Sequence, residues 1–428
     1  MRVISISVVL GGLVLAGCGG GEGESGPAAP APAAAPAPAD AEPRRDALIG
    51  GPYPSLLVTQ AHFVDKMIDG KRQSVPGPAR LIILRDTGSG WKPVVVDDPD
   101  SNVLHKAIDF GGGVLTIGAT KALLRTWRFA GGVWSPDTHW NPAFGGRFDR
   151  LRDIEHGDLD GDEHDELVIA THDQGVIAII HPEDGWRVEE IDRRPTTFVH
   201  EIEIGDVDGD GQSEFFATPS KPNKLEKEQP GEVVMFRRTG QGWAKSIVDA
   251  PHDTHAKEIL AADVNGDGAA TLFVVWEGAV GQGGELVRPV TIKSYGWRES
   301  DPKNADGSPQ GVVVATVPDR QMRSIAAGDV NHDGRIDLVA GALSSGLYLF
   351  EQTGDGWTQT PIDQHSSGYE HPVHVADLDG DGKLEIYVAS EDQGELRRYV
   401  WNGTTFAKTV LMPLAKSDIT WNVTHGTF

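Results

Sequence analysis

The chain contains a single cysteine in 428 residues, Cys18, so no disulfide can form within one molecule. Basic residues are also scarce, because 38 Lys and Arg stand against 63 Asp and Glu, which gives a formal net charge of −25. This excess of negative charge argues against nucleic acid or an anionic membrane surface as a partner, since both would repel the protein. The apolar run 3–15 is shorter than the roughly 20 residues that a membrane-spanning helix needs. A hydrophobic content of 39% is nevertheless enough for a sizeable core.

The N-terminus has a basic start, the apolar run and then the motif Leu15-Ala16-Gly17-Cys18. This arrangement resembles a bacterial lipoprotein signal with its lipobox. The resemblance implies a signal peptide over 1–17, lipid on Cys18 and a membrane-anchored lipoprotein, either periplasmic or at the cell surface. An ordinary secretory signal or a short membrane anchor is the alternative. Residues 18–51, rich in Gly, Ala and Pro, predict a semi-extended tether, and the folded domain is expected over 52–428.

One nine-residue loop carries side-chain oxygens at its positions 1, 3, 5 and 9. Carboxylates packed this closely repel one another unless they surround a cation. Hard oxygen ligands without cysteine favour calcium, whose flexible coordination shell suits such a loop better than the strict octahedron of magnesium. The glycines between them let the backbone curl tightly. The predicted ligands are Asp206, Asp208, Asp210 and Glu214.

The same loop recurs four more times, with first aspartates 48, 57, 66 and 48 residues apart along the chain. A period of this size is typical of a solenoid or a propeller. Short β-forming runs flank each loop and two more follow, and four antiparallel strands in each period describe a propeller blade. The further candidate ligands are Asp158, Asp160, Asp162 and Glu166; Asp263, Asn265 and Asp267; Asp329, Asn331, Asp333 and Asp337; and Asp377, Asp379, Asp381 and Glu385.

The strand pattern also appears upstream of residue 150 without a carboxylate loop. Counted in this way, the chain has seven second strands, beginning with 56–60, but only six first strands before residue 400. The run 419–424 supplies the missing first strand and would pair with 56–60, which closes the ring and removes exposed sheet edges. The sequence therefore predicts an all-β, seven-bladed β-propeller of four-stranded antiparallel blades, one of them closed by strands from both termini. Six or eight blades are the alternatives.

The loop pattern D-x-[DN]-x-D-G-x-x-[DE], followed by an apolar strand, resembles the FG-GAP repeats of integrin alpha-subunit propellers and the related bacterial VCBS-type repeats. The resemblance covers nearly all of 52–428 and implies structural calcium at up to five loops, with the best fit at the loops that begin at Asp206 and Asp377. His332 and Glu163 stand where the family prefers Gly, and Thr271 replaces the ninth-position carboxylate of the loop at Asp263, which should bind calcium least well. Metal-free hairpin turns are the alternative.

In a propeller of this type the first strand of each blade runs from one face, called the top face below, along the central channel to the calcium loop. The starts of the first strands and the connections between second and third strands therefore share the top face. There the sequence gathers histidines with Arg, Lys and Glu around one channel mouth. The candidates are His200, His255, His371 and His374 as acid–base groups or transition-metal ligands, and Glu201, Lys257, Arg320 and Arg323 as ligand-binding groups.

Two functions compete for these residues. The favoured hypothesis is a non-enzymatic, calcium-stabilised, surface-anchored protein whose top face binds a protein or glycan ligand. The other is a sugar-directed lyase or dehydratase-like enzyme that uses the top-face histidines. Polar side chains that merely line a wet channel are the plain alternative to both. Neither a nucleophile elbow, a phosphate-binding glycine loop nor a dinucleotide fingerprint occurs in the sequence.

Recurrent Gly-Trp turns are the remaining motif. Exposed indole rings can stack on sugars, whereas indoles that recur at the same position of every blade can pack between blades. The regular recurrence favours packing. The tryptophans concerned are Trp91, Trp186, Trp243, Trp297 and Trp357.

Overall fold

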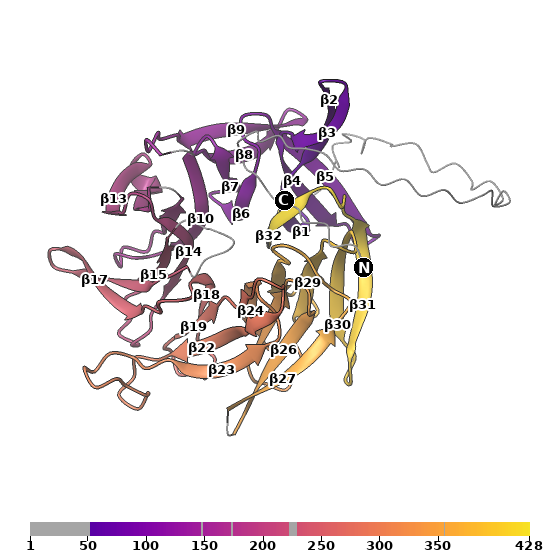
Figure 1. Ribbon diagram of the computed structural model, residues 1–428. Coiled ribbons are helices and arrows are strands. Elements are labelled where there is room, and N and C mark those ends of the chain that lie inside the picture. The colour runs from indigo at the N-terminus through magenta and orange to yellow at the C-terminus, as the bar shows by residue number, and fades with distance from the viewer. Residues whose placement is uncertain (1–51, 147–148, 173, 222–228, 355) are drawn as a thin grey trace. The chain divides into compact units, whose positions relative to one another are not determined.

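The computed structural model describes residues 52–146, 149–172, 174–221, 229–354 and 356–428, which form a β-propeller (Figure 1). The predicted signal peptide 1–17 and the tether 18–51 with Cys18 lie outside the described residues. Within the described ranges the only helical element is one short 3₁₀ helix, Pro182–Asp184. No helix of this part of the chain is long and apolar enough to span a membrane.

A typical blade shows why these segments form strands. It consists of β14 (Phe198–Gly205), β15 (Glu214–Ser220), β16 (Val233–Thr239) and β17 (Gly242–Asp249), paired antiparallel in this order. The second strand β15 is buried along its whole length, as expected for a strand covered on both faces by neighbouring sheets. The fourth strand β17 is mostly exposed at the outer edge.

The structure has four other separate four-stranded sheets. They are β32 (Ile419–Thr427), β1 (Pro54–Ala61), β4 (Ala79–Asp86) and β5 (Trp91–Asp98); β18 (Ala256–Ala262), β19 (Thr271–Trp276), β22 (Val290–Tyr295) and β23 (Val312–Val317); β24 (Met322–Gly328), β25 (Asp337–Ala342), β26 (Leu347–Thr353) and β27 (Gly356–Asp363); and β28 (Val373–Ala376), β29 (Glu385–Ser390), β30 (Glu395–Trp401) and β31 (Phe406–Pro413).

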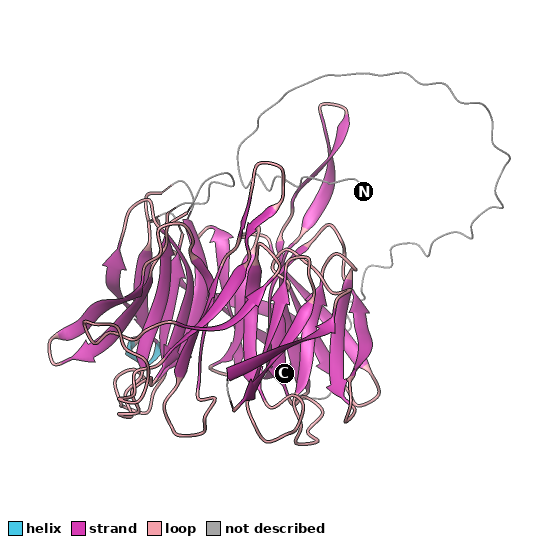
Figure 2. Ribbon diagram, turned by 60° about the horizontal axis from the view of Figure 1, so that its bottom comes forward, coloured by secondary structure: helices cyan, strands magenta, loops and turns pink. Residues whose placement is uncertain are grey.

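The remaining strands of the ring form one eight-stranded sheet. It contains β6 (Leu104–Phe110), β7 (Gly113–Thr120), β8 (Leu124–Ala130) and β9 (Val133–Trp140), followed by β10 (Asp149–Gly157), β11 (Glu166–Thr171), β12 (Val176–His181) and β13 (Arg187–Arg193). Two short hairpins, β2 (Phe63–Ile68) with β3 (Lys71–Pro76) and β20 (Ala279–Val280) with β21 (Leu286–Arg288), interrupt two of the second-to-third connections. Figure 2 shows the sheets from another side, with hairpins that project beyond them.

The predicted count of seven separate blades is wrong, because the described residues form five separate four-stranded blades and the one eight-stranded sheet. Strand β10 pairs with β7 through Asp149 opposite Thr120 and Arg150 opposite Ala119, and then continues as the partner of β11. This pairing joins β6–β9 to β10–β13. The pairing of β10 with β7 depends on how closely their backbones approach. The hydrophobic pattern of the sequence contains no information about this distance.

The closure by both termini is confirmed. Strands β1 and β32 pair antiparallel, with Val58 opposite Val423, and the amide of Gln60 donates a hydrogen bond to the hydroxyl of Thr420 over 3.1 Å. The first and last strands of the described domain therefore lie side by side (Figure 1). This pairing covers the inner edge of β1, which would otherwise be unpaired.

The core lies between neighbouring sheets, whereas the first strands surround the centre of the ring. In one cluster, Val275 and Ile292 pack with Leu338 and Phe350 of the next sheet. Around the centre, the contacts run in succession between the first strands β32, β6, β10, β14, β18, β24 and β28 (Figure 1). Side chains from the first strands can therefore meet across the centre.

The turn tryptophans pack as the sequence indicated. Trp91 lies on Tyr387, Trp297 on Phe216 and Trp357 on Phe273, each an aromatic residue of a neighbouring sheet, with ring centroids 6.1, 5.5 and 5.7 Å apart. Trp243 packs on Phe215 of its own sheet at 4.9 Å. These aromatic contacts help to hold the sheets together.

Candidate functional sites

The carboxylate loops

Each carboxylate loop folds around its first aspartate. Asp206 accepts hydrogen bonds from the backbone of Gly209 (2.7 Å) and Gly211 (2.8 Å). Asp377 accepts the equivalent bonds from Gly380 and Gly382, both 2.8 Å. The loops that begin at Asp158, Asp263 and Asp329 follow the same pattern.

At two loop positions another residue replaces glycine, and the backbone keeps the same conformation around the first aspartate. His332 has φ 59° and Glu163 has φ 69°, in the left-handed region that Gly209 (75°) and Gly211 (85°) occupy at the corresponding positions. A side chain in this region is strained by roughly 1–2 kcal/mol. The hydrogen bonds to the first aspartate hold the backbone in place despite this strain.

Three of the five loops bring together carboxylate oxygens that lie within 4.8 Å of one another. This spacing suits oxygen ligands that share one calcium ion. Two further oxygens, Oδ1 of Asp208 and Oδ2 of Asp337, are buried without a hydrogen-bond partner in the described part of the chain, which also fits a cation. The converging groups are Asp377, Asp379, Asp381 and Glu385; Asp158, Asp160 and Glu166; and Asp206, Asp208 and Asp210.

The pKa shifts of carboxylates in the loops also fit a bound cation. Burial raises the pKa of Glu214 and of Glu385. Burial, together with Asp333 and Glu351, raises the pKa of Asp337 to about 7. A bound divalent cation would lower all three values because it stabilises the ionised carboxylates.

Arginines pair with the carboxylates of two loops. Arg237 lies 2.8 Å from Asp208 and 2.9 Å from Glu214. Arg398 lies 2.8 Å from Glu385 and also contacts Asp379. Calcium would have to displace these guanidinium groups from the oxygens it binds.

The loop at Asp263 does not fit a metal as the others do. Its ninth position is Thr271, which has no carboxylate, and the guanidinium of Arg298 contacts Asp267 and donates a 2.5 Å hydrogen bond to the carbonyl of Ala269. This loop therefore has only two carboxylates, and one of them already pairs with a resident arginine.

The top face

His200, on β14, has no exposed surface. Its Nε2 lies 2.9 Å from the hydroxyl of Ser220, and its Nδ1 lies 3.3 Å from Nε2 of His172. The amine of Lys257, on the neighbouring first strand β18, is 3.0 Å from the same Nδ1. His200 therefore contacts Lys257 directly. It also contacts His172, which lies in the connection between β11 and β12.

Burial shifts the titration of all these groups. It lowers the pKa of His200 well below its usual value, with a further contribution from Lys257. It lowers the pKa of His255 to about 3. The pKa of Lys257 falls to about 7, first because of burial and second because of Arg323. At neutral pH the two histidines are therefore uncharged, and the lysine is close to half protonated.

A network of buried ion pairs extends from this group across the centre of the ring. Arg323 on β24 pairs with Glu277 at 3.0 Å and with Glu370 at 2.8 Å. Arg152 on β10 lies 3.2 Å from Glu201 and 3.9 Å from Glu370. Glu370 thus links side chains from different sheets, and the mouth of the channel is spanned by charged groups.

The other two candidate histidines lie in different surroundings. His371 is fully buried; its Nε2 is 2.7 Å from the hydroxyl of Ser366, and its Nδ1 is 2.7 Å from the carbonyl of Ala342. His374 pairs instead with His425 at 2.7 Å. Within the described ranges, the groups of three or more closely spaced metal-ligand side chains are those of the loops, and the four histidines do not assemble into one group.

Two of the candidate ligand-binding residues have distinct positions. Glu201 is buried in the ion pair with Arg152. Arg320 is exposed, and its backbone carbonyl accepts a 2.9 Å hydrogen bond from Gly278. Glu201 therefore belongs to the network, and Arg320 lies at its rim.

The sequence reasoning missed a second buried charged group in the channel. Lys106 on β6 lies 3.1 Å from Asp153 and contacts Glu155, both on β10. Burial raises the pKa of Glu203 and Glu258 well above the usual value. Charged and apolar residues alternate along the first strands. In the sequence, this alternation indicates which side chains point into the channel.

Residues 329–388 match the family model described as "FG-GAP-like repeat". The matched segment contains the whole loops at Asp329 and Asp377 and spans parts of two neighbouring blades. The chain is therefore a β-propeller that carries an FG-GAP-like repeat at residues 329–388.

Two solved structures similar to this chain carry the provisional name 6-phosphogluconolactonase. One is from Bacteroides fragilis (12% identity, TM-score 0.52), with 87% of this chain and 98% of that chain covered. The other is from Bacteroides uniformis (12% identity, TM-score 0.51), with 87% and 99% covered. At this identity the likeness concerns the fold alone. A sequence search of curated proteins gave no significant match.

Proposed function

We propose that the protein is a calcium-stabilised, lipid-anchored extracytoplasmic propeller that binds a protein or glycan ligand at its top face through an anionic group of that ligand. The observation that carries this proposal is the position of Lys257, a buried amine that touches His200 beside the Arg323 and Arg152 network. Lys257, Arg323 and Arg152 place three cationic groups at one channel mouth, and a ligand carboxylate would meet complementary charge there.

The anchoring and the calcium belong to the same proposal on separate grounds. The lipobox at Cys18 supports export and lipidation. The converging oxygens of three loops, together with the orphaned oxygens at Asp208 and Asp337, support calcium. If bound, calcium would supply positive charge to loops whose carboxylates otherwise repel one another, and would hold β-strands of the same blade together.

A binding screen tests the ligand site. The full chain is applied to arrays of glycans and of secreted proteins, and each hit is titrated with the wild type and with Lys257→Met. We expect binding to weaken at least tenfold in the variant, since one buried charge-assisted contact contributes about 1.5–3 kcal/mol. Lys92→Met, on the exposed strand β5, is the matched control and should bind as the wild type does. Equal affinity of wild type and Lys257→Met for every hit would refute the proposed site.

A second function is favoured by one specific observation. Lys257 titrates near pH 7 and lies 3.0 Å from an uncharged imidazole, which is a plausible acid–base pair. In a sugar-directed lyase, such a base would remove the proton next to a carboxylate while the bond to the leaving oxygen breaks and a carbon–carbon double bond forms. The lactonase name of the two similar structures is not transferred, because their similarity extends to the fold only.

Turnover measurements separate the two functions. Uronic-acid oligosaccharides are incubated with the protein, and the unsaturated product is followed by its ultraviolet absorbance. The enzyme hypothesis expects product formation that His200→Ala abolishes without a change in folding, whereas the binding hypothesis expects saturable binding with no product. Metal analysis of the purified chain adds a check on the transition metal considered for the top face.

A further inference from the structure

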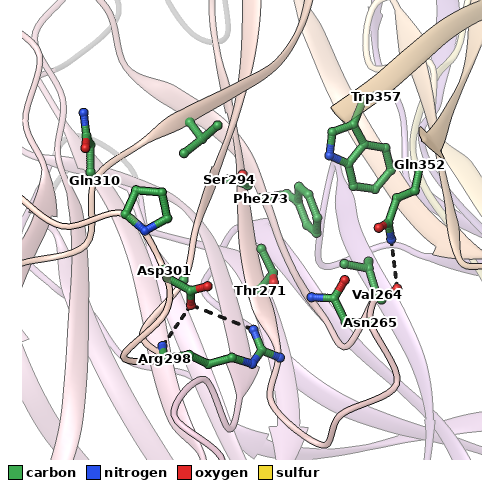
Figure 3. Close-up of a pocket in the computed structure, with 13 residues that line it drawn as sticks. Val264, Asn265, Thr271, Phe273, Ser294, Arg298, Asp301, Gln310, Gln352 and Trp357 are labelled. Atoms are coloured by element: carbon green, nitrogen blue, oxygen red, sulfur yellow. Dashed lines mark hydrogen bonds and ion pairs between the residues drawn. The ribbon is translucent and has the colours of Figure 1, made fainter. Parts of the chain in front are cut away.

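A cavity of about 180 Å³ lies beside the loop at Asp263, at the opposite end of β18 from Lys257. It is lined by residues of the sheet β18–β19–β22–β23, by the segment between β22 and β23, and by Gln352 and Trp357 of the next sheet (Figure 3). The proposed top-face site does not include it.

One wall of the cavity lies at the ninth position of the loop, where Thr271 stands in place of a carboxylate. In the loop at Asp206, Glu214 accepts a 3.2 Å hydrogen bond from the backbone of Val207. The ninth position of the loop at Asp263 is Thr271, whose shorter side chain cannot fold back in this way, and Thr271 and Val264 line the cavity instead. The position that completes a metal loop elsewhere has become part of a cavity wall.

The cavity offers hydrogen-bonding groups that the protein does not use. The side chains of Asn265, Thr271, Ser294 and Gln310 form no hydrogen bond with any described residue, yet hydroxyls and amides both donate and accept. The cationic side chain of the lining, Arg298, is already paired with two aspartates, and this group carries a net negative charge. Arg298 contacts Asp267 and is 3.9 Å from Asp301, whose carboxylate also accepts a 2.9 Å hydrogen bond from the Arg298 backbone.

Aromatic surface completes the lining. Trp357 and Phe273 both border the cavity, and Figure 3 shows them on its side nearest Gln352. Gln352 is itself held by a 2.8 Å hydrogen bond to the carbonyl of Val264. An aromatic wall with neutral donors and acceptors around it matches a ligand that has one apolar face and several hydroxyls.

We propose that this cavity binds a single neutral sugar ring, a hexose or an N-acetylhexosamine, as a free sugar or as a unit of a glycan. The ring would lay its C–H face against Trp357, and its hydroxyls would bond to Asn265, Thr271 and Gln310. The volume limits the ligand to one ring, because pockets for drug-sized molecules measure about 300–1,000 Å³. Arg298 with its two aspartates carries a net negative charge, which disfavours an anionic sugar relative to a neutral one.

Titration of the full chain with D-glucose, D-galactose, D-mannose and N-acetyl-D-glucosamine tests this proposal. Binding is followed by tryptophan fluorescence and by calorimetry. A ligand of about a dozen heavy atoms with ordinary ligand efficiency has a Kd of about 1 mM, so at least one of the four should saturate near that concentration. No saturation of any of them at about twenty times that concentration overturns the proposal.

Two variants and two controls locate the site. Trp357→Ala should weaken binding at least tenfold, and Gln310→Ala, an exposed position where folding is not at risk, should weaken it several-fold. Trp91→Ala is the matched control, because Trp91 occupies the same kind of turn and packs on Tyr387 of a neighbouring sheet. Lys257→Met should keep sugar binding, which separates this site from the top face. Binding that survives both cavity variants, or that is lost equally in Trp91→Ala, overturns the assignment.

Discussion

The amine of Lys257 lies 3.0 Å from Nδ1 of His200, and these residues begin the first strands of two neighbouring sheets. Lys257 is almost completely buried, with 4% of its surface exposed. Burial and the nearby Arg323 guanidinium lower the pKa of its amine to about 7. The protonation of Lys257 therefore changes close to neutral pH, and we expect the stability of the protein to change with it.

The first prediction concerns this pH dependence. The pKa of Lys257 is lowered from 10.5 to about 7 in the folded state, so between these values the unfolded chain binds a proton that the folded chain has released. The stability cost is complete below pH 7 and fades as the pH rises toward 10.5. Lys257→Met should therefore increase the free energy of unfolding by roughly 2–3 kcal/mol more at pH 6 than at pH 9. Urea unfolding at the two pH values measures this difference. Lys92→Met should show none, and equal changes for Lys257→Met at both values would contradict the prediction.

The second prediction concerns calcium. Chelation should lower the melting temperature, and calcium at about 100 times its Kd should add about 2.7 kcal/mol to the free energy of unfolding for each occupied site. Asp377→Ala should remove one such increment, because Asp377 belongs to the group of four converging carboxylates. Asp263→Ala removes the equivalent aspartate of the loop that has Thr271 in place of the ninth-position carboxylate, so it should leave the calcium increment unchanged. A melting curve that chelation does not alter would rule out the structural role.

The third prediction concerns loop strain. Glu163 has φ 69°, a conformation that glycine adopts without strain. Glu163→Gly should stabilise the protein by up to about 1 kcal/mol, measured by urea unfolding in the presence of a chelator. The reverse change at the matched position of another loop, Gly382→Ala with φ 83°, should destabilise it by about 1–2 kcal/mol, although the added methyl group meets no atom within 4 Å. A loss of stability in Glu163→Gly would show that the glutamate side chain contributes more than the backbone strain removes.

The fourth prediction concerns ring closure. Removal of 419–428 deletes β32 and exposes the backbone edge of β1 that pairs with it. We expect a lower melting temperature and association into larger species, because an unpaired edge strand offers its hydrogen bonds to other chains. Size-exclusion chromatography and thermal melting measure both effects.

A second deletion is the control for this experiment. Replacement of 63–76 by a two-residue turn removes the hairpin β2–β3, whose base is closed by a 2.8 Å hydrogen bond from Gly77 to His62. The ring keeps all its sheets, so the melting temperature should change little. Equal damage from both deletions would contradict a special role for the terminal pairing.

Much of the site could be predicted because it consists of short-range features. The aspartates and glycines of the loop at Asp206 lie within nine residues, and their hydrogen bonds are local. For the top face, the sequence predicted which segments lie there but not which side chains are in contact. Lys257 and His200, from two of these segments, do contact each other. The common environment assumed for the histidines was not found, since His371 instead bonds to Ala342 and Ser366.

By itself, the sequence determined the strands, the wrap of the carboxylate loops and the pairing of the two terminal strands, because alternation, turn residues and repeated motifs act over a few residues or recur in register. The tertiary structure alone decided that β10 joins β7, that Glu370 links Arg323 with Arg152 across the ring, and that Thr271 borders a cavity. These features depend on the approach of side chains and backbones from different sheets. Arg152 and Glu370 are more than two hundred residues apart, and only the closed ring brings them together.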